Sequence, residues 1–125
     1  MRARKQDIPV AFEDGKSYSR DTEWGDMNVA WEAWAAGMDA TPMFKGLPDD
    51  RCQCPHWGYL IKGRVRIKYR DHEEVINAGE VYYLPPGHTP VAEEDSEMVE
   101  FSPKSEYRKT MEVAIRNMKA LNKAG

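Results

Sequence analysis

Residues 56–90, HWGYLIKGRVRIKYRDHEEVINAGEVYYLPPGHTP, decide the fold, because short apolar runs alternate there with turn-forming residues. The run 56–61 ends at Lys62-Gly63, and RVRIKYR (64–70) then alternates strictly between charged and apolar side chains. Alternation with a period of two is typical of a strand with one buried and one solvated face. Further short runs at 74–76 and 81–84 are each bounded by turn signals. This spacing predicts an all-β sandwich or barrel.

The segments on either side extend this pattern. Val91 and residues 97–101 predict two more short strands. Residues 27–36, MNVAWEAWAA, fit both strand alternation and a helical face, and their short length between Gly25 and Gly37 favours a strand. Residues 37–50 contain two glycines and two prolines and are expected to form a loop. Residues 1–26 are polar and irregular, which predicts an N-terminal arm or edge segment.

The C-terminal part changes period. Ser102 and Pro103 offer a helix cap followed by a proline at the first helical position. Beyond them apolar residues recur at helical spacing and predict one amphipathic helix over 104–122. These residues are Tyr107, Met111, Ala114, Ile115, Met118 and Leu121. We expect the helix to dock on the barrel or on a partner chain, with its methionines filling the core.

Composition limits the function classes. A length of 125 residues suits one domain, 1–125, in which 27–103 form the barrel. A net charge of −3 argues against nonspecific binding to nucleic acid. No apolar run is long enough to cross a bilayer, and no targeting segment is visible, so no membrane partner is expected. Cys52 and Cys54 lie too close together for a stabilising disulfide, which favours a reduced, cytoplasmic protein.

The barrel segment resembles the cupin superfamily, which has a jelly-roll β-barrel fold. The second cupin motif reads Gly, five residues, Pro, one residue, Gly, two residues, His, three residues, Asn. Gly79, Pro85 and Gly87 match its spacing, whereas Pro90 stands at the histidine position and Glu94 at the asparagine position. His88, directly after Gly87, is the histidine that this chain offers instead. The resemblance predicts a cupin-type jelly-roll barrel with one C-terminal helix, and a homodimer.

The first cupin motif reads Gly, five residues, His-x-His, three or four residues, Glu, six residues, Gly. With Gly63 as its final glycine, His56 takes the glutamate position, Cys52 the second histidine and Asp50 the first. With Gly46 as its first glycine, Cys52 and Cys54 take the two histidine positions. Both alignments place Cys52 in the site, and the stronger strand pattern around Gly63 favours the first.

Cupins hold a divalent metal ion inside the barrel, and the resemblance transfers part of that site. Cys52 and His56 lie four residues apart, so an extended strand directs both to one face. His88 is the natural third ligand, and Cys54, Asp50 and Glu100 are weaker candidates for a fourth. Thiolate and imidazole suit zinc first, and also iron, nickel or copper. The alternative is a lost metal site, in which these side chains are buried for packing alone.

Aromatic residues flank both motifs and the preceding strand. About half of them are expected to point into the barrel, where they would line an apolar pocket for a small organic molecule. The alternative is that they belong to an ordinary core and a dimer face. The residues are Trp31, Trp34, Trp57, Tyr59, Tyr82 and Tyr83.

Three functions follow from these features. The first is a metal-dependent enzyme on a small molecule, an oxygenase or isomerase, with Tyr59, His88 or Glu100 as acid–base group. The second is a non-catalytic module that binds or senses a small ligand in the same cavity. The third is a structural dimeric barrel without metal, whose dimer face is made by the N-terminal arm and the C-terminal helix. Fold alone does not choose among them.

Overall fold

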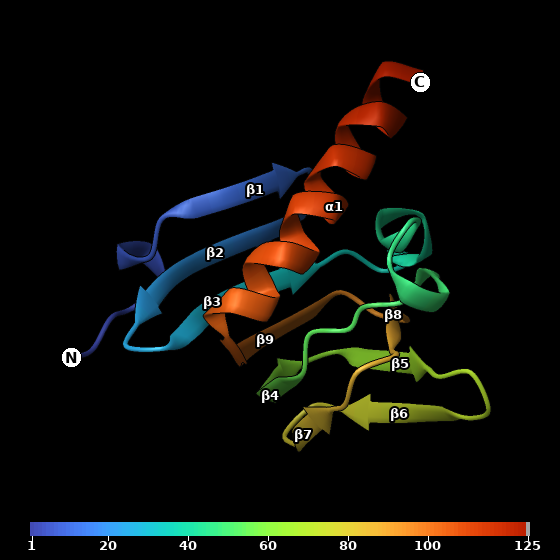
Figure 1. Cartoon of the computed structure of the whole chain (residues 1–125). Coiled ribbons are helices and arrows are strands. Elements are labelled where there is room, and N and C mark those ends of the chain that lie inside the picture. The colour runs from blue at the N-terminus through green and yellow to red at the C-terminus, as the bar shows by residue number, and fades with distance from the viewer. Residues whose placement is uncertain (125) are drawn as a thin grey trace.

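The computed structural model describes residues 1–124, with side chains described as far as Leu121. The chain folds into two antiparallel sheets with one C-terminal helix lying against the larger sheet (Figure 1). The larger sheet has the strand order β1-β2-β3-β9-β4-β7, and the smaller has the order β6-β5-β8. The strands are β1 Val10–Asp14, β2 Ser17–Trp24, β3 Met27–Trp34, β4 His56–Lys62, β5 Arg64–Lys68, β6 Glu73–Asn77, β7 Val81–Leu84, β8 Thr89–Ala92 and β9 Ser96–Pro103. The helices are η1 Lys5–Asp7, η2 Thr41–Phe44, η3 Pro48–Asp50 and α1 Lys104–Ala124.

The strands expected between residues 56 and 90 are all present. On β5, Val65 and Ile67 are buried, whereas the charged residues between them are partly exposed. Arg66 on the outer side donates to Glu93 at 2.8 Å and to Glu73 at 3.0 Å. Alternation in the sequence therefore becomes one apolar and one salt-bridged face, as expected for a strand on the surface of a barrel.

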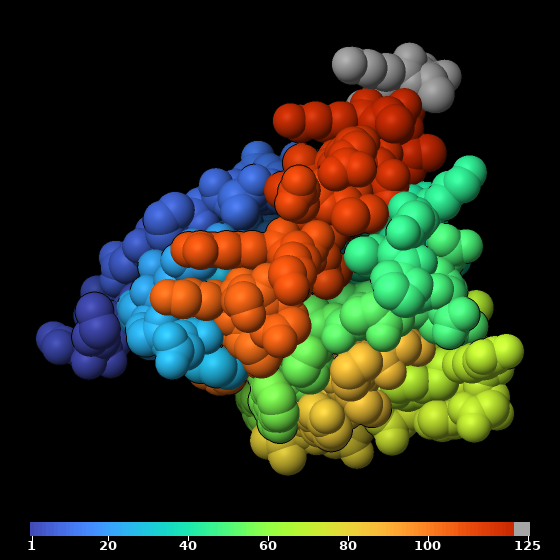
Figure 2. Space-filling model, in the orientation of Figure 1, coloured from blue at the N-terminus to red at the C-terminus, as the bar shows by residue number. Residues whose placement is uncertain are grey.

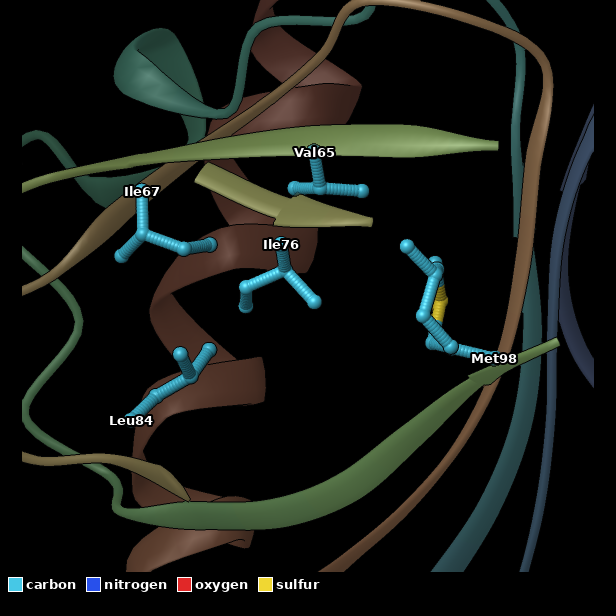
Figure 3. Close-up of a cluster of buried hydrophobic side chains, with 6 residues drawn as sticks. Val65, Ile67, Ile76, Leu84 and Met98 are labelled. Atoms are coloured by element: carbon cyan, nitrogen blue, oxygen red, sulfur yellow. The ribbon is translucent and has the colours of Figure 1, made fainter. Parts of the chain in front are cut away.

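The two sheets close over a small apolar core. Leu60, Val65, Ile67, Ile76, Leu84 and Met98 form this cluster, and five of them are labelled in Figure 3, where their side chains point toward one another. All six are at most 4% exposed. Burial of each such side chain stabilises the fold by about 1.5–3 kcal/mol, so this cluster joins the two sheets firmly.

The segment predicted as an N-terminal arm or edge segment contains two strands of the larger sheet. Gly15 and Gly25, at φ +61° and +59°, turn the chain between β1 and β2 and between β2 and β3. β2 pairs with β3 in register over its whole length except its first residue, from Tyr18↔Ala33 to Trp24↔Met27. β1 is the edge strand. The turn signals were present in the sequence, but the polar composition hid the strands, because much of this sheet surface is solvated.

The start of the C-terminal helix also differs from the prediction. β9 continues through Pro103, and α1 begins at Lys104, whose N–H donates to the carbonyl of Asp26 at 3.0 Å. Ser102 is 1% exposed and does not cap the helix, because its side chain faces the interior of the barrel.

Helix α1 docks on its own barrel. Tyr107, Thr110 and Ala114 are buried, and the Tyr107 hydroxyl donates to Asp21 at 2.8 Å. Asn117 donates from Nδ2 to the carbonyl of Met43 at 2.7 Å, which ties the helix to the η2 segment. In Figure 2 the helix crosses the face of the molecule between the N-terminal strands and the η2 region. Within residues 1–124, no helix has the length and apolar character needed to cross a membrane.

Candidate metal centre and cavity

Long-range pairing brings Cys52 and His88 together. The N–H of Cys52 donates to the carbonyl of His88 at 3.0 Å, and the N–H of Gly87 donates to the carbonyl of Cys52 at 2.8 Å. The loop before β4 and the loop between β7 and β8 therefore form an isolated bridge. Cys52 itself lies outside any strand, so the extended strand assumed for Cys52 and His56 is not what aligns them.

Cys52, His56 and His88 form a compact group of three candidate ligands. One ligand atom from each residue lies within 4.8 Å of the other two. Cys52 Sγ is 3.6 Å from His56 Nε2, and the two imidazole centroids are 4.9 Å apart at an interplanar angle of 63°. Ideal tetrahedral coordination at Zn–S of about 2.3 Å and Zn–N of about 2.0–2.1 Å separates sulfur and nitrogen by roughly 3.6 Å. The spacing of Cys52 Sγ and His56 Nε2 fits a metal ion of this kind.

Each histidine is oriented by a hydrogen bond at its other nitrogen. His56 Nδ1 lies 2.6 Å from Ser102 Oγ. His88 Nδ1 lies 2.7 Å from the carbonyl oxygen of Pro85, which can only accept, so Nδ1 carries the proton. These bonds leave Nε2 of both rings as the metal-binding atom, and such partners fix ring orientation in known metal sites.

Burial keeps the three groups neutral. It lowers the pKa of His56 and of His88 to about 4 and raises the pKa of the Cys52 thiol to about 12. For His88, the neighbouring His56 lowers the pKa further. Neutral imidazole is the form that binds metal, whereas the thiol must lose its proton when a metal ion arrives.

The three residues lie in the wall of a cavity of about 270 Å³. Its deep end contains Cys52, His88 and Glu100, each at most 5% exposed. Toward the outside the cavity runs between η2, the sheet and α1. Most side chains along this part are apolar: Phe12, Trp34, Met38, Met43, Phe44, Met111, Met118 and Leu121. Met111 and Met118 of the predicted helical stripe therefore line a cavity rather than only filling the core.

Two buried carboxyl groups face the same cavity. Glu100, a predicted candidate, receives a hydrogen bond from the Tyr82 hydroxyl at 2.6 Å, and its Oε1 lies 3.9 Å from His56 Nδ1. Glu32 on β3 was not predicted, and its Oε1 receives a hydrogen bond from Ser19 Oγ at 3.2 Å. Burial raises the pKa of both carboxyl groups, and their mutual repulsion raises that of Glu32 further.

The structure places the two weaker candidates from the first motif away from this group. Cys54 is fully buried, but its Sγ contacts the carbonyl of Pro55 at 3.5 Å, and it does not line the cavity. Asp50 is exposed in η3, and its Oδ1 accepts a hydrogen bond from the N–H of Gly46 at 2.9 Å. Pro55 and the 3₁₀ turns make this segment irregular, so alignment along an ideal strand misplaces both residues.

The predicted pocket aromatics divide between the two faces of the sheet. Trp34 lines the cavity, and Tyr82 packs on the core cluster and holds Glu100. The other four face outward, whereas about half of the six were expected to do so. The Trp31 indole donates to Glu97 at 2.7 Å on the outer face, and Trp57, Tyr59 and Tyr83 are more than 40% exposed. Tyr59 is therefore not an acid–base group of this site.

The reason for this division is strand alternation. On β4 the inward positions are His56, Gly58 and Leu60, and on β7 they are Tyr82 and Leu84. The aromatic residues at the intervening positions must face outward. Glu32 is inward for the same reason, because it shares its face of β3 with Ala30 and Trp34. The pairing register of β3 with β9 determines which residues of β3 face inward. The sequence alone does not fix this register, so Glu32 was missed.

Comparison with solved structures identifies the architecture. An RmlC-like cupin from Shewanella frigidimarina NCIMB 400 superposes with a TM-score of 0.58 at 12% identity, over 81% of this chain and 88% of that chain. KdgF from Halomonas sp. gives a TM-score of 0.58 at 17% identity, over 80% and 90%. A mutant of the oxalate decarboxylase OxdC of Bacillus subtilis gives 0.60 at 18% identity, over 78% of this chain and 28% of that one.

These likenesses confirm the predicted fold, a cupin-type jelly roll with a C-terminal helix. At such low identity they show the fold alone. A scan of protein-family models found no match to the chain, and a search of curated protein sequences found none either.

Proposed function

We propose that this cupin-fold protein binds one divalent metal ion through Cys52 Sγ, His56 Nε2 and His88 Nε2, and a small organic molecule beside it. The observation that carries the proposal is the convergence of these three ligand atoms within 4.8 Å at the deep end of a mostly apolar cavity. Three protein ligands leave a fourth position for water or a ligand, which is the pattern of reactive rather than purely structural zinc sites.

Zinc is the first choice of metal. One thiolate and two imidazoles are ligands of borderline softness, which zinc favours, and iron, nickel and copper accept the same donors. The bound ion would supply Lewis-acid polarisation of the organic molecule. Glu100 is the group placed to hold or move a proton there, because burial raises its pKa and Tyr82 fixes its position. An oxygenase or an isomerase acting on a small apolar molecule fits this arrangement.

A specific observation favours a second candidate, which is binding or sensing without catalysis. The second nitrogens of His56 and His88 are already engaged by Ser102 and Pro85. The Tyr82 hydroxyl holds Glu100. Acid–base groups that are free to move protons are therefore scarce beside the three ligands, whereas the cavity remains large enough for a ligand.

Elemental analysis of the untagged protein tests the metal site. We expect near-stoichiometric metal in the wild type and its loss in Cys52→Ser and in His56→Ala. Cys54→Ser is the matched control, because Cys54 is equally buried two residues away but does not belong to the three-ligand group. A protein that takes up no zinc, iron, nickel or copper, or a Cys54→Ser variant that loses metal as fully as Cys52→Ser, contradicts the site. Turnover of a bound ligand would then separate the enzyme from the binder.

A further inference from the structure

The charged side chains around the cavity all have the same sign. Asp14, Glu32, Asp39 and Glu100 line it, and no described lysine or arginine does. The two aspartates are exposed, whereas Glu32 and Glu100 are 8% and 5% exposed. An anionic ligand would therefore meet carboxyl groups and no cationic side chain.

Glu32 gives the deep cavity a strong hydrogen-bond acceptor. Ser19 Oγ holds its Oε1 at 3.2 Å. Because a buried carboxylate without a cation is costly, burial raises the pKa of this group well above its usual range. A cationic group on a ligand would supply the missing countercharge and form a charge-assisted hydrogen bond.

The remainder of the cavity suits a compact apolar body. Trp34, Met38, Phe44 and Met111 form walls without charge. An apolar cavity of about 150 Å³ is known to accept benzene. The volume of about 270 Å³ found here therefore accommodates one ring with a short polar substituent.

We propose that the cavity accepts a small apolar molecule bearing one amine, which Glu32 receives, and that it discriminates against carboxylates. This inference rests on the proposed function only in that the cavity is a ligand site, and it does not require the metal ion. The aromatic or aliphatic part of the ligand lies along the methionine-rich wall made by α1 and η2.

Three matched probes test the proposal: benzylamine, benzyl alcohol and benzoate, titrated by calorimetry into the zinc-free protein, in which no metal ion can bind the carboxylate. We expect benzylamine to bind roughly tenfold more tightly than either other probe, since only the amine forms a charge-assisted hydrogen bond with Glu32. In Glu32→Gln this preference should shrink to near equality with benzyl alcohol. Asp14→Asn, which changes an exposed carboxylate of the same cavity, is the control and should keep the preference.

Each outcome bears on the proposal. Benzoate binding as tightly as benzylamine, an unchanged preference in Glu32→Gln, or no binding of any probe overturns it. Amine preference in a protein that holds no metal supports the inference and contradicts the proposed metal site. Metal binding without amine preference supports the proposed metal site and contradicts the inference. The two failures are therefore distinguishable.

Discussion

His88 donates its Nδ1–H to the carbonyl oxygen of Pro85, 2.7 Å away and three residues earlier in the chain. The bond closes the turn after β7 and at the same time directs Nε2 toward Cys52 and His56. One local contact thus provides both the turn geometry and the tautomer that a metal ion needs. It also explains how His88 can be a candidate metal ligand although Pro90 stands at the position where cupins usually carry a histidine.

Replacing Ser102 with alanine should weaken metal binding without unfolding the barrel. Ser102 Oγ lies 2.6 Å from His56 Nδ1 and orients the ring. Losing such a partner typically lowers metal affinity about 10–100-fold. Competition with a chromophoric chelator measures this for zinc. Ser105→Ala, at an exposed position at the start of α1, should bind as the wild type does, and equal affinities for the two variants would contradict the role of Ser102.

Ending the chain after Pro103 should destabilise the protein and lower its solubility. The deletion removes Tyr107 and Ala114 from the buried surface and uncovers Phe44 in η2. Tyr107→Ala is a milder test and should cost about 3–5 kcal/mol in the free energy of unfolding by urea. Lys109→Ala on the exposed side of α1 should cost little. A truncated chain as stable as the full one would show that the helix is not docked.

Gly58→Ala should destabilise the fold and disturb Glu100. A Cβ at this position would lie 2.5 Å from Tyr82 Cζ and 2.7 Å from the carbonyl oxygen of Val99. Overpacking of this kind costs about 1–3 kcal/mol. Combining Gly58→Ala with Tyr82→Ala should recover part of this loss, because it removes one of the two clashes. Chemical unfolding of the four proteins in this cycle measures the coupling, and strict additivity would contradict it.

Glu32→Gln should stabilise the metal-free protein at neutral pH. Burial, with repulsion from Glu100, raises the pKa of Glu32 well above its usual value in the folded state. The folded protein then holds this proton to higher pH than the unfolded chain does, so its stability falls as pH rises through that window. Each unit of pKa shift corresponds to about 1.4 kcal/mol.

Urea unfolding across a pH series separates this effect from a packing change. The advantage of Glu32→Gln over the wild type should vanish in acid, below the pKa of an ordinary glutamate, where both side chains are neutral. A variant that is less stable than the wild type at every pH would show that the Glu32 carboxyl group is stabilising in its charged form.

Most strands of the barrel could be predicted from the local alternation of apolar and polar residues. Val65 and Ile67 alternate with arginines, and the glycines and prolines around them mark the turns, so β5 and its neighbours could be predicted from short stretches. The strands within residues 1–26 could not, because β1 and β2 expose much of their surface and carry few apolar residues to reveal a period. Their strand state depends on pairing with β3.

The ligand candidates of the site were predicted in part, but the spacing argument used to choose them does not match the structure. Cys52 and His56 were chosen as neighbours on one strand, but Cys52 lies before β4 and is held instead by a backbone bridge to His88. Asp50 was chosen by the same spacing and lies at the surface. Spacing along a chain predicts a shared face only where the backbone is regular, and Pro55 interrupts it here.

The sequence by itself determined where the strands after residue 26 run and that Cys52, His56 and His88 are the metal-ligand candidates, because side-chain type and short-range period are local properties. Only the tertiary structure decided which face of β3 and of β4 is inside. That decision placed Glu32 in the cavity and Trp57 on the surface, since both follow from the register between β3, β9 and β4. A shift of one residue in that register would exchange the two faces, and no local pattern fixes it.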